Sequence, residues 1–433
     1  MKPPSPPSPA EPACQDPPAQ PRRRFSLRIE PWQRNLYIII LAQLIGILGF
    51  SLAVPFLPFY LEELGASGFE ELAFWVGFIN SAGPIVMALA SPVWGAVADR
   101  YGRKPMLVRA FVGGGVVMIL MALAQTVPQL ATLRIIQGAL SGSVTAATVL
   151  VATCVPPEQR GYALGLLQSA IFAGHSLGPM LGGTAGGLWG YRVPFVGAGV
   201  LLMIAGLVVT LLVHETFERP APRPRQRFSL KALRGARMDP MVVTMLVLMM
   251  MNRLSTSVTL PMLPLYVQTL VATEQQASTA TGWISGATSL ANAIAAVAVG
   301  KAADRLGRRR VLLACLGLAA VGYMPQMLTT TPLQLLLLRA ITGFAGGGLV
   351  PVSSAILAER APEGRHGAIY GLSSSLTSAG RAVGPVIGTV AVTQWGLGSV
   401  FPITGVMLAL VTAYVAMATR GMERRMATER VEG

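Results

Sequence analysis

Twelve apolar segments, each long enough to cross a lipid bilayer, are the feature that most limits what this chain can fold into. A spanning helix needs about 20 mostly apolar residues to cross the hydrocarbon layer. The segments are Leu36–Tyr60, Trp75–Val97, Pro105–Ala124, Leu130–Val151, Tyr162–Leu188, Val193–Val213, Met241–Leu265, Thr281–Ala303, Val311–Leu328, Leu333–Ala358, Gly367–Thr393 and Val400–Ala418. With 52% hydrophobic and 12% charged residues, an ordinary soluble protein is excluded. We predict an all-α integral membrane protein with twelve transmembrane helices.

A repeated pattern divides these segments into two sets of six. Residues recur at an offset of 205 or 206 positions. The recurring sets are Gly95, Asp99, Arg100, Gly102 and Arg103 with Gly300, Asp304, Arg305, Gly307 and Arg308; Arg134 and Gly138 with Arg339 and Gly343; Glu158 and Arg160 with Glu363 and Arg365; Pro55 and Pro58 with Pro261 and Pro264; and Gly178-Pro179 with Gly384-Pro385. A parallel duplication of this kind predicts two pseudo-symmetric six-helix bundles with a binding site between them near the bilayer midplane.

The segments also set the domain boundaries. We expect a proline-rich disordered tail over residues 1–32, a first bundle over 33–213, a basic linker over 214–240, a second bundle over 241–419 and a short tail over 420–433. The first two dozen residues contain no apolar stretch, so a cleavable signal peptide is not expected.

Basic residues give the orientation. The net charge is +15, but the Lys and Arg residues form short clusters between apolar segments, and the turns on one side contain only Arg192. Positively charged loops stay cytoplasmic, so both termini and the linker are expected inside, in a plasma (inner) membrane, and no nucleic acid partner is expected. The three cysteines support neither a disulfide framework nor a metal site, and no cofactor is expected.

Three motifs resemble the major facilitator superfamily, specifically its twelve-helix drug:proton antiporter branch. They are the loop Gly95–Lys104, the helix-four pattern Arg134-x-x-Gln137-Gly138 and the helix-five pattern Gly174-x-x-x-Gly178-Pro179-x-x-Gly182-Gly183. The first helix, which ends FSLAVPFLPFYLEELG, looks most like the MdtG-type group of multidrug exporters. The resemblance runs from about Gln33 to Thr419. It implies the superfamily fold, alternating access, proton-coupled efflux of drugs or other small amphiphilic molecules, and a role for Arg134 in proton movement.

The loop signature and its repeat predict a conformational latch made by Asp99, Arg100, Gly102, Arg103, Asp304, Arg305 and Arg308. A carboxylate at the end of one helix can accept hydrogen bonds from the N-terminus of a neighbouring helix and pair with guanidinium groups. We expect this network to bridge the two halves on the cytoplasmic side when the outer side is open. Breaking it would then be part of the transport cycle.

The helix-five glycines lie on one helix face. Gly174, Gly178, Gly182 and Gly183 permit close backbone approach, and Pro179 removes an amide donor and bends the helix. We expect tight packing at the interface between the halves, although helix packing without directional meaning is an equally open interpretation.

Ionisable residues inside the membrane are candidates for substrate or proton contacts because burying them unpaired is costly. Arg253, Arg381 and His175 lie near segment centres, whereas Arg134 and Arg339 lie in the outer parts of theirs, and no Asp or Glu lies in the middle of any segment. The midplane is therefore predicted to be electropositive and to bind neutral, zwitterionic or anionic amphiphiles. Further polar contacts are expected from Asn252, Asn80, Asn292 and Gln43.

His175 is the one intramembrane group that titrates near neutral pH in its unperturbed state, so it is the candidate proton carrier; a packing role is the alternative. We expect a monomer that meets a small-molecule substrate, protons and lipid. An importer or exporter of a small anionic metabolite remains a second candidate function. Motifs of intramembrane enzymes and of ATP-driven pumps are absent from the sequence, so no enzyme is expected.

Overall fold

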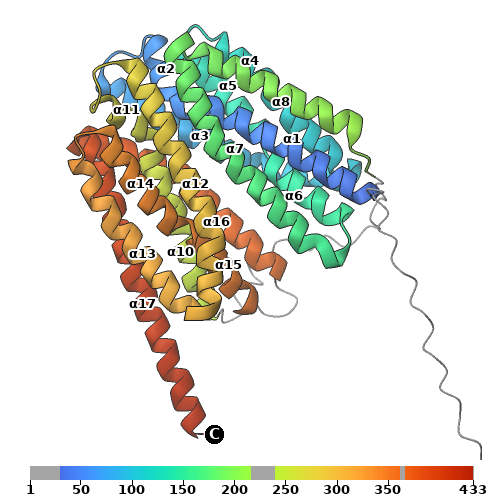
Figure 1. Ribbon diagram of the computed structural model, residues 1–433, viewed down its shortest axis with the longest axis vertical. Helices are drawn as coiled ribbons and strands as arrows, with labels where there is room; N and C mark the ends of the chain where they lie inside the picture. Colours follow the sequence, from blue (N-terminus) through green and yellow to red (C-terminus); the bar gives the residue numbers. More distant parts are fainter. Residues whose placement is uncertain (1–29, 216–238, 361–365, 433) are drawn as a thin grey trace, which may run out of the picture.

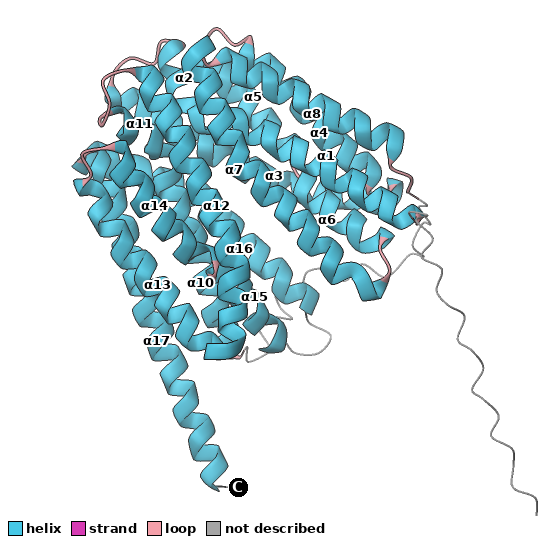
Figure 2. Cartoon of the chain, in the orientation of Figure 1, coloured by secondary structure: helices cyan, strands magenta, loops and turns pink. Residues whose placement is uncertain are grey.

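The chain folds into two helical bundles, described by a computed structural model for residues 30–215, 239–360 and 366–432. In Figure 1 the first bundle is blue to green and the second is yellow to red. The described residues contain no β-strand (Figure 2). The prediction of an all-α membrane protein with two six-helix bundles is confirmed for this part of the chain.

The first half follows the predicted segments. Its elements are α1 (Pro31–Ala53), η1 (Val54–Phe56), α2 (Leu57–Glu63), α3 (Phe69–Tyr101), α4 (Lys104–Ala122), α5 (Val127–Leu140), α6 (Ser143–Cys154), η2 (Pro157–Gln159), α7 (Arg160–Trp189) and α8 (Arg192–Leu212). The chain bends at Pro55 and Pro58 between α1 and α2. The fourth span is divided into α5 and α6 at Gly142, whose φ of 122° favours glycine.

The second half repeats this order. Its elements are α10 (Pro240–Thr259), η3 (Leu260–Met262), α11 (Leu263–Gln268), α12 (Glu274–Leu306), α13 (Arg308–Tyr323), η4 (Met324–Leu328), α14 (Pro332–Gly347), α15 (Leu349–Arg360), α16 (His366–Trp395), η5 (Leu397–Ser399) and α17 (Val400–Glu432). The bend at Pro261 and Pro264 between α10 and α11 matches the bend in the first half. The duplication is therefore structural as well as sequential.

Ten of the described spans are apolar enough to cross a membrane by composition alone, and α7 and α16 are the two that are not. Both are 30 residues long and rich in glycine, serine and threonine. Each packs on the first helix of its own half and on a helix of the other half: α7 on α1 and α12, and α16 on α10 and α3. Because protein rather than lipid surrounds much of them, they need less apolar surface than the outer helices.

The halves meet at one end and separate at the other (Figure 1). We call the end with α2 and α11 the distal side and the end where α1 begins the terminal side. Three hydrogen bonds with hydroxyl donors cross between the halves: Ser176 Oγ to the Gly286 oxygen at 3.0 Å, Ser278 Oγ to the Gly183 oxygen at 2.9 Å, and Thr389 Oγ1 to the Ala73 oxygen at 3.0 Å. They lie in the middle and distal parts of α3, α7, α12 and α16. We call this contact the seam.

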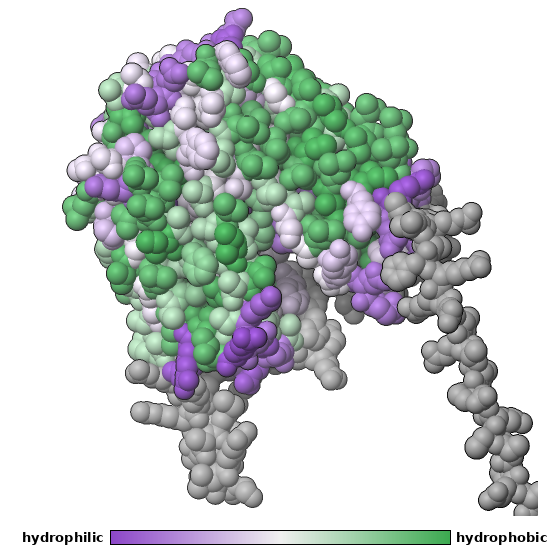
Figure 3. Space-filling view, in the orientation of Figure 1, coloured by the Kyte–Doolittle hydropathy of each residue, from purple (hydrophilic) through white to green (hydrophobic). Residues whose placement is uncertain are grey.

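On the terminal side the same helices stand apart. A Cβ atom added at Gly95, Gly161, Gly165 or Gly300 would meet no atom within 4 Å. The space-filling view shows a notch between the halves on this side, apolar side chains over much of the face in view, and hydrophilic side chains toward the two ends (Figure 3). The protein is therefore closed at the distal side and open at the terminal side.

The glycine face of α7 packs mainly inside the first half. Added Cβ atoms at Gly174, Gly178 and Gly182 would run into α1, whereas Gly183 faces α12 of the other half. The expected position at the interface between the halves is therefore right for Gly183 and wrong for the other three glycines. The repeat explains the difference, because Gly380, Gly384 and Gly388 of α16 pack on α10 in the same way. The pattern holds the fifth helix of each half against the first.

The structure describes part of the predicted terminal regions. Residues 420–432, predicted as a tail, continue α17 as helix to Glu432. Their sequence, RGMERRMATERVE, contains mostly residues that favour helix. Hydropathy alone does not report this preference. Residues 1–29 of the proline-rich tail, residues 216–238 of the basic linker, and Glu363 and Arg365 of the repeat lie outside the described residues.

Replacing Gly182 by leucine should destabilise the first half, because any Cβ at this position overlaps the backbone oxygen of Leu52. We expect a loss of about 2 kcal/mol or more in the free energy of unfolding, within the range of overpacking effects. The matched control is Gly165→Ala, also in α7, where an added Cβ has open space; it should be neutral or stabilise by up to ~1 kcal/mol. Thermal unfolding of the purified proteins in detergent measures both, and equal melting temperatures would contradict this packing.

Candidate functional site

Three basic side chains lie between the halves near the middle of their helices. His175 is in α7 of the first half, and Arg253 of α10 and Arg381 of α16 are in the second. All three are exposed to solvent, and the charges of both arginines act on His175. Exposure at mid-helix, in a region closed on the distal side, places them along the space that opens to the terminal side. We call these three residues the basic cluster.

The basic cluster combines one pair of repeat-related positions with a third residue from the second half. His175 and Arg381 each precede a Gly-Pro pair by three residues, so they occupy equivalent places in the two halves. Arg253 adds a second guanidinium group from α10, close enough to act on Arg381. An anion between these groups would meet positive charge or hydrogen-bond donors from both halves. The structure thus places these three candidates from the sequence near one another.

Ser51 positions His175. The Ser51 hydroxyl and the His175 Nδ1 atom are 2.9 Å apart, and the serine is buried in α1. Holding Nδ1 in this way leaves Nε2 as the atom available to a ligand. Ser51 is not among the residues predicted from the sequence, although the repeat contains a signal for it: Ser51 lies four residues before Pro55, and Ser257 lies four residues before Pro261.

Arg134 lies apart from the basic cluster. Its Nη1 donates to the Gln137 side chain, and its guanidinium group lies 5.6 Å from the ring centre of Phe50 in α1. The repeat-related Arg339 is almost fully buried in the second half beside the Tyr323 ring. Neither arginine forms a recorded contact with His175, Arg253 or Arg381, so the resemblance-based role of Arg134 in proton movement gains no direct geometric support.

The expected amide contacts are distributed differently. Gln43 is fully buried within the first half, and neither of its side-chain polar atoms has a hydrogen-bond partner among the described residues. Asn80 and Asn292 donate to the carbonyl oxygens of Val76 and Thr288 in their own helices. Asn252 is half-buried and precedes Arg253 in α10. The helical periodicity of the sequence gives the face on which each amide lies. It does not show whether that face is buried inside one half or exposed between the halves.

A further intramembrane cation was missed by the sequence analysis. Arg109 of α4 lies 3.7 Å from the ring centre of Trp94, and its Nη2 atom donates to the Ser141 oxygen at 3.1 Å. Ser141 precedes Gly142, where α5 and α6 divide, so Arg109 satisfies a carbonyl group that the break leaves free. Its contacts are those of a structural residue within the first half.

The predicted latch residues lie at the terminal side, and each ion pair among them stays within one half. Arg103 contacts Asp99 at 2.7 Å, and Arg308 contacts Asp304 at 3.8 Å and Glu359 at 2.5 Å. The Asp99 and Asp304 side chains are 66% and 72% exposed, so these pairs add little to stability. Among the described latch residues, no ion pair joins the two halves in this state.

The remaining latch residues shape the two turns. Gly102 and Gly307 have φ angles of 97° and 91°, which residues with a side chain rarely adopt. They follow the ends of α3 and α12 at equivalent positions in the two halves. The Arg100 guanidinium group lies over the Tyr101 ring, while Arg305 is exposed.

The carboxylate that binds a helix N-terminus at this loop belongs to Glu215. Its two oxygens accept hydrogen bonds from the backbone amides of Arg103 and Lys104, both at 2.8 Å. The expectation that Asp99 would bind a neighbouring helix N-terminus is therefore wrong in this state. Asp99 is at the end of α3 and pairs with Arg103, whereas Glu215, just after α8, reaches the free amides at the start of α4.

The described residues contain no group of three or more His, Cys, Asp or Glu side chains that could hold a metal ion.

Comparison with known proteins identifies the family. The model of the Major Facilitator Superfamily matches residues 39–271 and 245–431, which together include nearly all of the chain. The chain belongs to this superfamily. It is a multi-pass membrane protein and a secondary transporter, in agreement with the duplicated bundles and the solvent-accessible basic cluster between them.

Curated relatives narrow the comparison. The chain is 32% identical over 389 residues to the multidrug resistance protein MdtG of Enterobacter lignolyticus, covering 90% of this chain and 93% of that protein. It is 32% identical over 383 residues to MdtG of Yersinia enterocolitica and 33% identical over 378 residues to MdtG of Escherichia coli, covering 88% and 87% of this chain and 92% of each relative. The similarity to the MdtG-type group expected from the first helix is confirmed.

Solved structures share the fold at low sequence identity. A bacterial homologue of the human lysosomal transporter Spinster, in an inward-facing and unoccupied conformation, has a TM-score of 0.74 and 14% identity, covering 90% of this chain and 97% of that one. The human organic anion transporter MFSD10 has a TM-score of 0.63 and 19% identity, covering 89% of this chain and all of that one.

Asp99→Asn should impair transport while leaving membrane insertion intact. The substitution removes the charge that pairs with Arg103 here and that would bridge the halves when the terminal side closes. We expect transport below about a tenth of the wild-type rate, the factor that ~1.4 kcal/mol of lost state stabilisation gives. Glu70→Gln, at an exposed distal position, is the control with the same loss of charge. Wild-type transport by the Asp99 variant at equal membrane abundance would remove the latch from the mechanism.

Proposed function

We propose that this transporter exports neutral, zwitterionic or anionic amphiphilic drugs in exchange for protons. The observation that carries the substrate class is the basic cluster, in which Arg253 and Arg381 approach His175 with no carboxylate in the middle of any described span. A substrate with a carboxylate or another acidic group would provide the missing negative charge. The names of the MdtG relatives support drugs as the cargo.

We place the terminal side in the cytoplasm of a cell whose plasma (inner) membrane holds the protein. Arg192 is the one Lys or Arg in the turns on the distal side, and the other turns are basic. In this orientation both termini are cytoplasmic and the conformation is inward-facing. The basic cluster is then accessible to substrate from the cell interior, as the first step of export requires.

Transport would proceed by rocking of the two halves about the substrate. In the inward-facing state the seam closes the distal side; substrate binding would draw the terminal ends together, and the seam would part. Negative charge on the substrate favours closure of the terminal ends, because the bound substrate lies between His175 of one half and the two arginines of the other. One chain provides every residue of the cluster, so we propose that the monomer is the functional unit.

A small anionic metabolite is the second candidate substrate, because the same arginines would bind it. An importer would accumulate the metabolite in cells that express the protein, whereas an exporter of amphiphilic drugs lowers their cellular content. Purified protein in liposomes with an imposed pH gradient, tested against anionic, zwitterionic, neutral and cationic dyes, separates the two. Proton-driven movement of cationic dyes alone would contradict the proposed substrate class.

Arg253→Gln and Arg381→Gln should each weaken binding of anionic substrates more than binding of neutral ones. Losing one hydrogen bond to a charged group costs about 1.5–3 kcal/mol, so we expect KM for an anionic dye to rise by about 10- to 100-fold. Arg192→Gln removes a charge from the distal turn and serves as the control. Transport assays with a matched pair of dyes that differ only in a carboxylate measure the effect. An equal rise for both dyes would exclude recognition of the carboxylate.

A further inference from the structure

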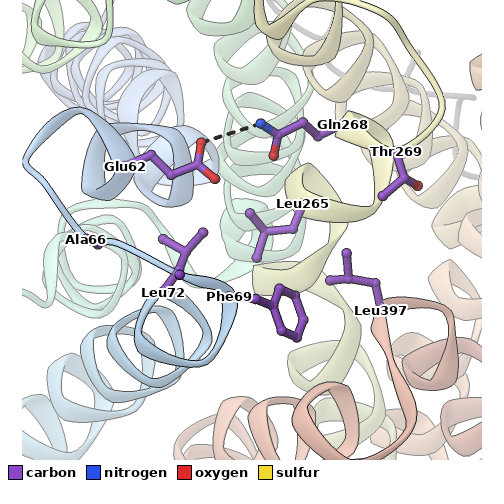
Figure 4. Close-up of a pocket in the computed structure, with 9 residues that line it drawn as sticks. Glu62, Ala66, Phe69, Leu72, Leu265, Gln268, Thr269 and Leu397 are labelled. Atoms are coloured by element: carbon purple, nitrogen blue, oxygen red, sulfur yellow. Dashed lines mark hydrogen bonds between the residues drawn. The ribbon is translucent and has the colours of Figure 1, made fainter.

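The distal end of the seam contains a carboxylate without a cationic partner. Glu62 of α2 is half-buried and lines a cavity of about 330 Å³ formed by both halves (Figure 4). The first half provides Glu62, Ala66, Gly68, Phe69 and Leu72; the second provides Leu265, Gln268, Thr269 and Leu397. Most of these side chains are apolar, so they offer the carboxylate little replacement for lost water.

The groups that face Glu62 from the second half are neutral or negative. Gln268 Nε2 of α11 donates to Glu62 Oε2 at 3.5 Å, a long hydrogen bond that crosses between the halves (Figure 4). The other charge that acts on Glu62 is that of Glu274 at the start of α12, an exposed carboxylate. Closing the seam therefore brings two acidic groups from opposite halves together.

Tyr191 stands beside both acids. Its ring stacks on Phe59 with centroids 5.3 Å apart, and the side chain is 6% exposed. Burial, together with the negative charges of Glu274 and Glu62, raises the pKa of Tyr191, so its hydroxyl stays protonated and adds no positive charge. The tyrosine can donate a hydrogen bond but cannot neutralise a carboxylate.

The remaining charged and titratable groups near this end are engaged elsewhere or exposed. Arg192 pairs with Glu63 at 3.4 Å, and the Glu71 carboxylate accepts from the Ser67 amide. Glu70 is exposed at the start of α3, and Tyr60 donates its hydroxyl to backbone oxygens within the first half. Among the described residues, no cation pairs with Glu62 or Glu274.

The proposed function requires exchange of a proton for an anion. The basic cluster cannot readily provide this exchange. A proton on His175 and an anion beside it attract each other, so binding of one favours binding of the other. Exchange needs a titrating group whose protonated form favours a different step of the cycle. Carboxylates that come together when the distal side closes, such as Glu62 and Glu274, meet this requirement.

We propose that Glu62, together with Glu274, makes closure of the distal side depend on protons. Protonation removes the negative charge that partial burial and the neighbouring acid disfavour, and so stabilises the closed seam seen here. Loss of the proton restores that cost and favours opening. Acidity outside the cell would then return an emptied carrier to the inward-facing state. A role for this closure in transport rests on the proposed proton exchange. The dependence of distal closure on pH does not rest on it.

Distances between spin labels across the distal end test the proposal. Cysteines replace Ser67 of the first half and Ala272 of the second, both exposed, in protein whose native cysteines Cys14, Cys154 and Cys315 are replaced by serine. Double electron–electron resonance on full-length protein in lipid nanodiscs, without substrate or gradient, gives the distance distribution between pH 5 and pH 8. We expect the short-distance population to grow as pH falls, by up to about tenfold in the closed-to-open ratio per pH unit for one coupled proton.

Three variants separate Glu62 from its surroundings. Glu62→Gln, which imitates the protonated acid, should keep the short distance at both pH values and lose the pH response. Gln268→Glu adds a carboxylate opposite Glu62 and should lengthen the distance at pH 8 relative to wild type. Glu63→Gln, the neighbouring acid that pairs with Arg192, is the matched control and should keep the wild-type response.

The proposal would be overturned by a wild-type protein whose distances do not change with pH, or by a Glu62→Gln protein with an unchanged response. Gln268→Glu keeps the test informative if Glu62→Gln is poorly folded, because a distance at pH 8 no longer than that of wild type would also refute it. Failure of proton-driven drug export in liposomes, with an intact distance response, would refute the proposed function and leave the pH-dependent closure standing.

Discussion

Close approach of small residues between helices is the constraint on which the rest of this structure depends. Lipid tails are as apolar as leucine, so helices in a membrane gain little from hiding apolar surface and associate through packing and hydrogen bonds. Gly174, Gly178 and Gly182 bring α7 onto α1, and the repeat brings α16 onto α10 in the same way. Each half is thereby a unit that can move as one body.

The seam uses the same small residues for contact between those bodies. Gly183 lies against Gly282, and Gly286 lies against Met180 and the backbone of Ser176. Few side chains interlock here, and three of the hydrogen bonds between the halves have a hydroxyl donor and a backbone acceptor. Such a contact can open without breaking an ion pair, which suits a carrier that alternates between two states. The charged groups are placed around this contact: the basic cluster at its middle and Glu62 at its distal end.

The sequence predicted the architecture well because a bilayer imposes a length and a polarity on each span, and because the duplication repeats motifs at one offset. It also selected His175, Arg253 and Arg381, since ionisable residues in apolar segments are rare. It could not assign neighbours: a helical period gives the face of Gly174 but not whether that face meets α1 or α12. For the same reason Gln43 was expected at the binding site and is buried within one half. Glu215 and Ser51 act through contacts between distant segments, which spacing alone does not reveal.

We infer that the seam must part in every transport cycle. A disulfide across it tests this most directly, using Gly77→Cys in α3 and Thr389→Cys in α16 in the cysteine-free protein. A Cβ at Gly77 would lie 3.1 Å from that of Thr389, close to the ~3.5–4.5 Å that a disulfide spans. We expect oxidation to stop transport in liposomes and a reductant to restore it, while the single Thr389→Cys variant stays active under oxidation. Undiminished transport by protein shown to be fully cross-linked would contradict it.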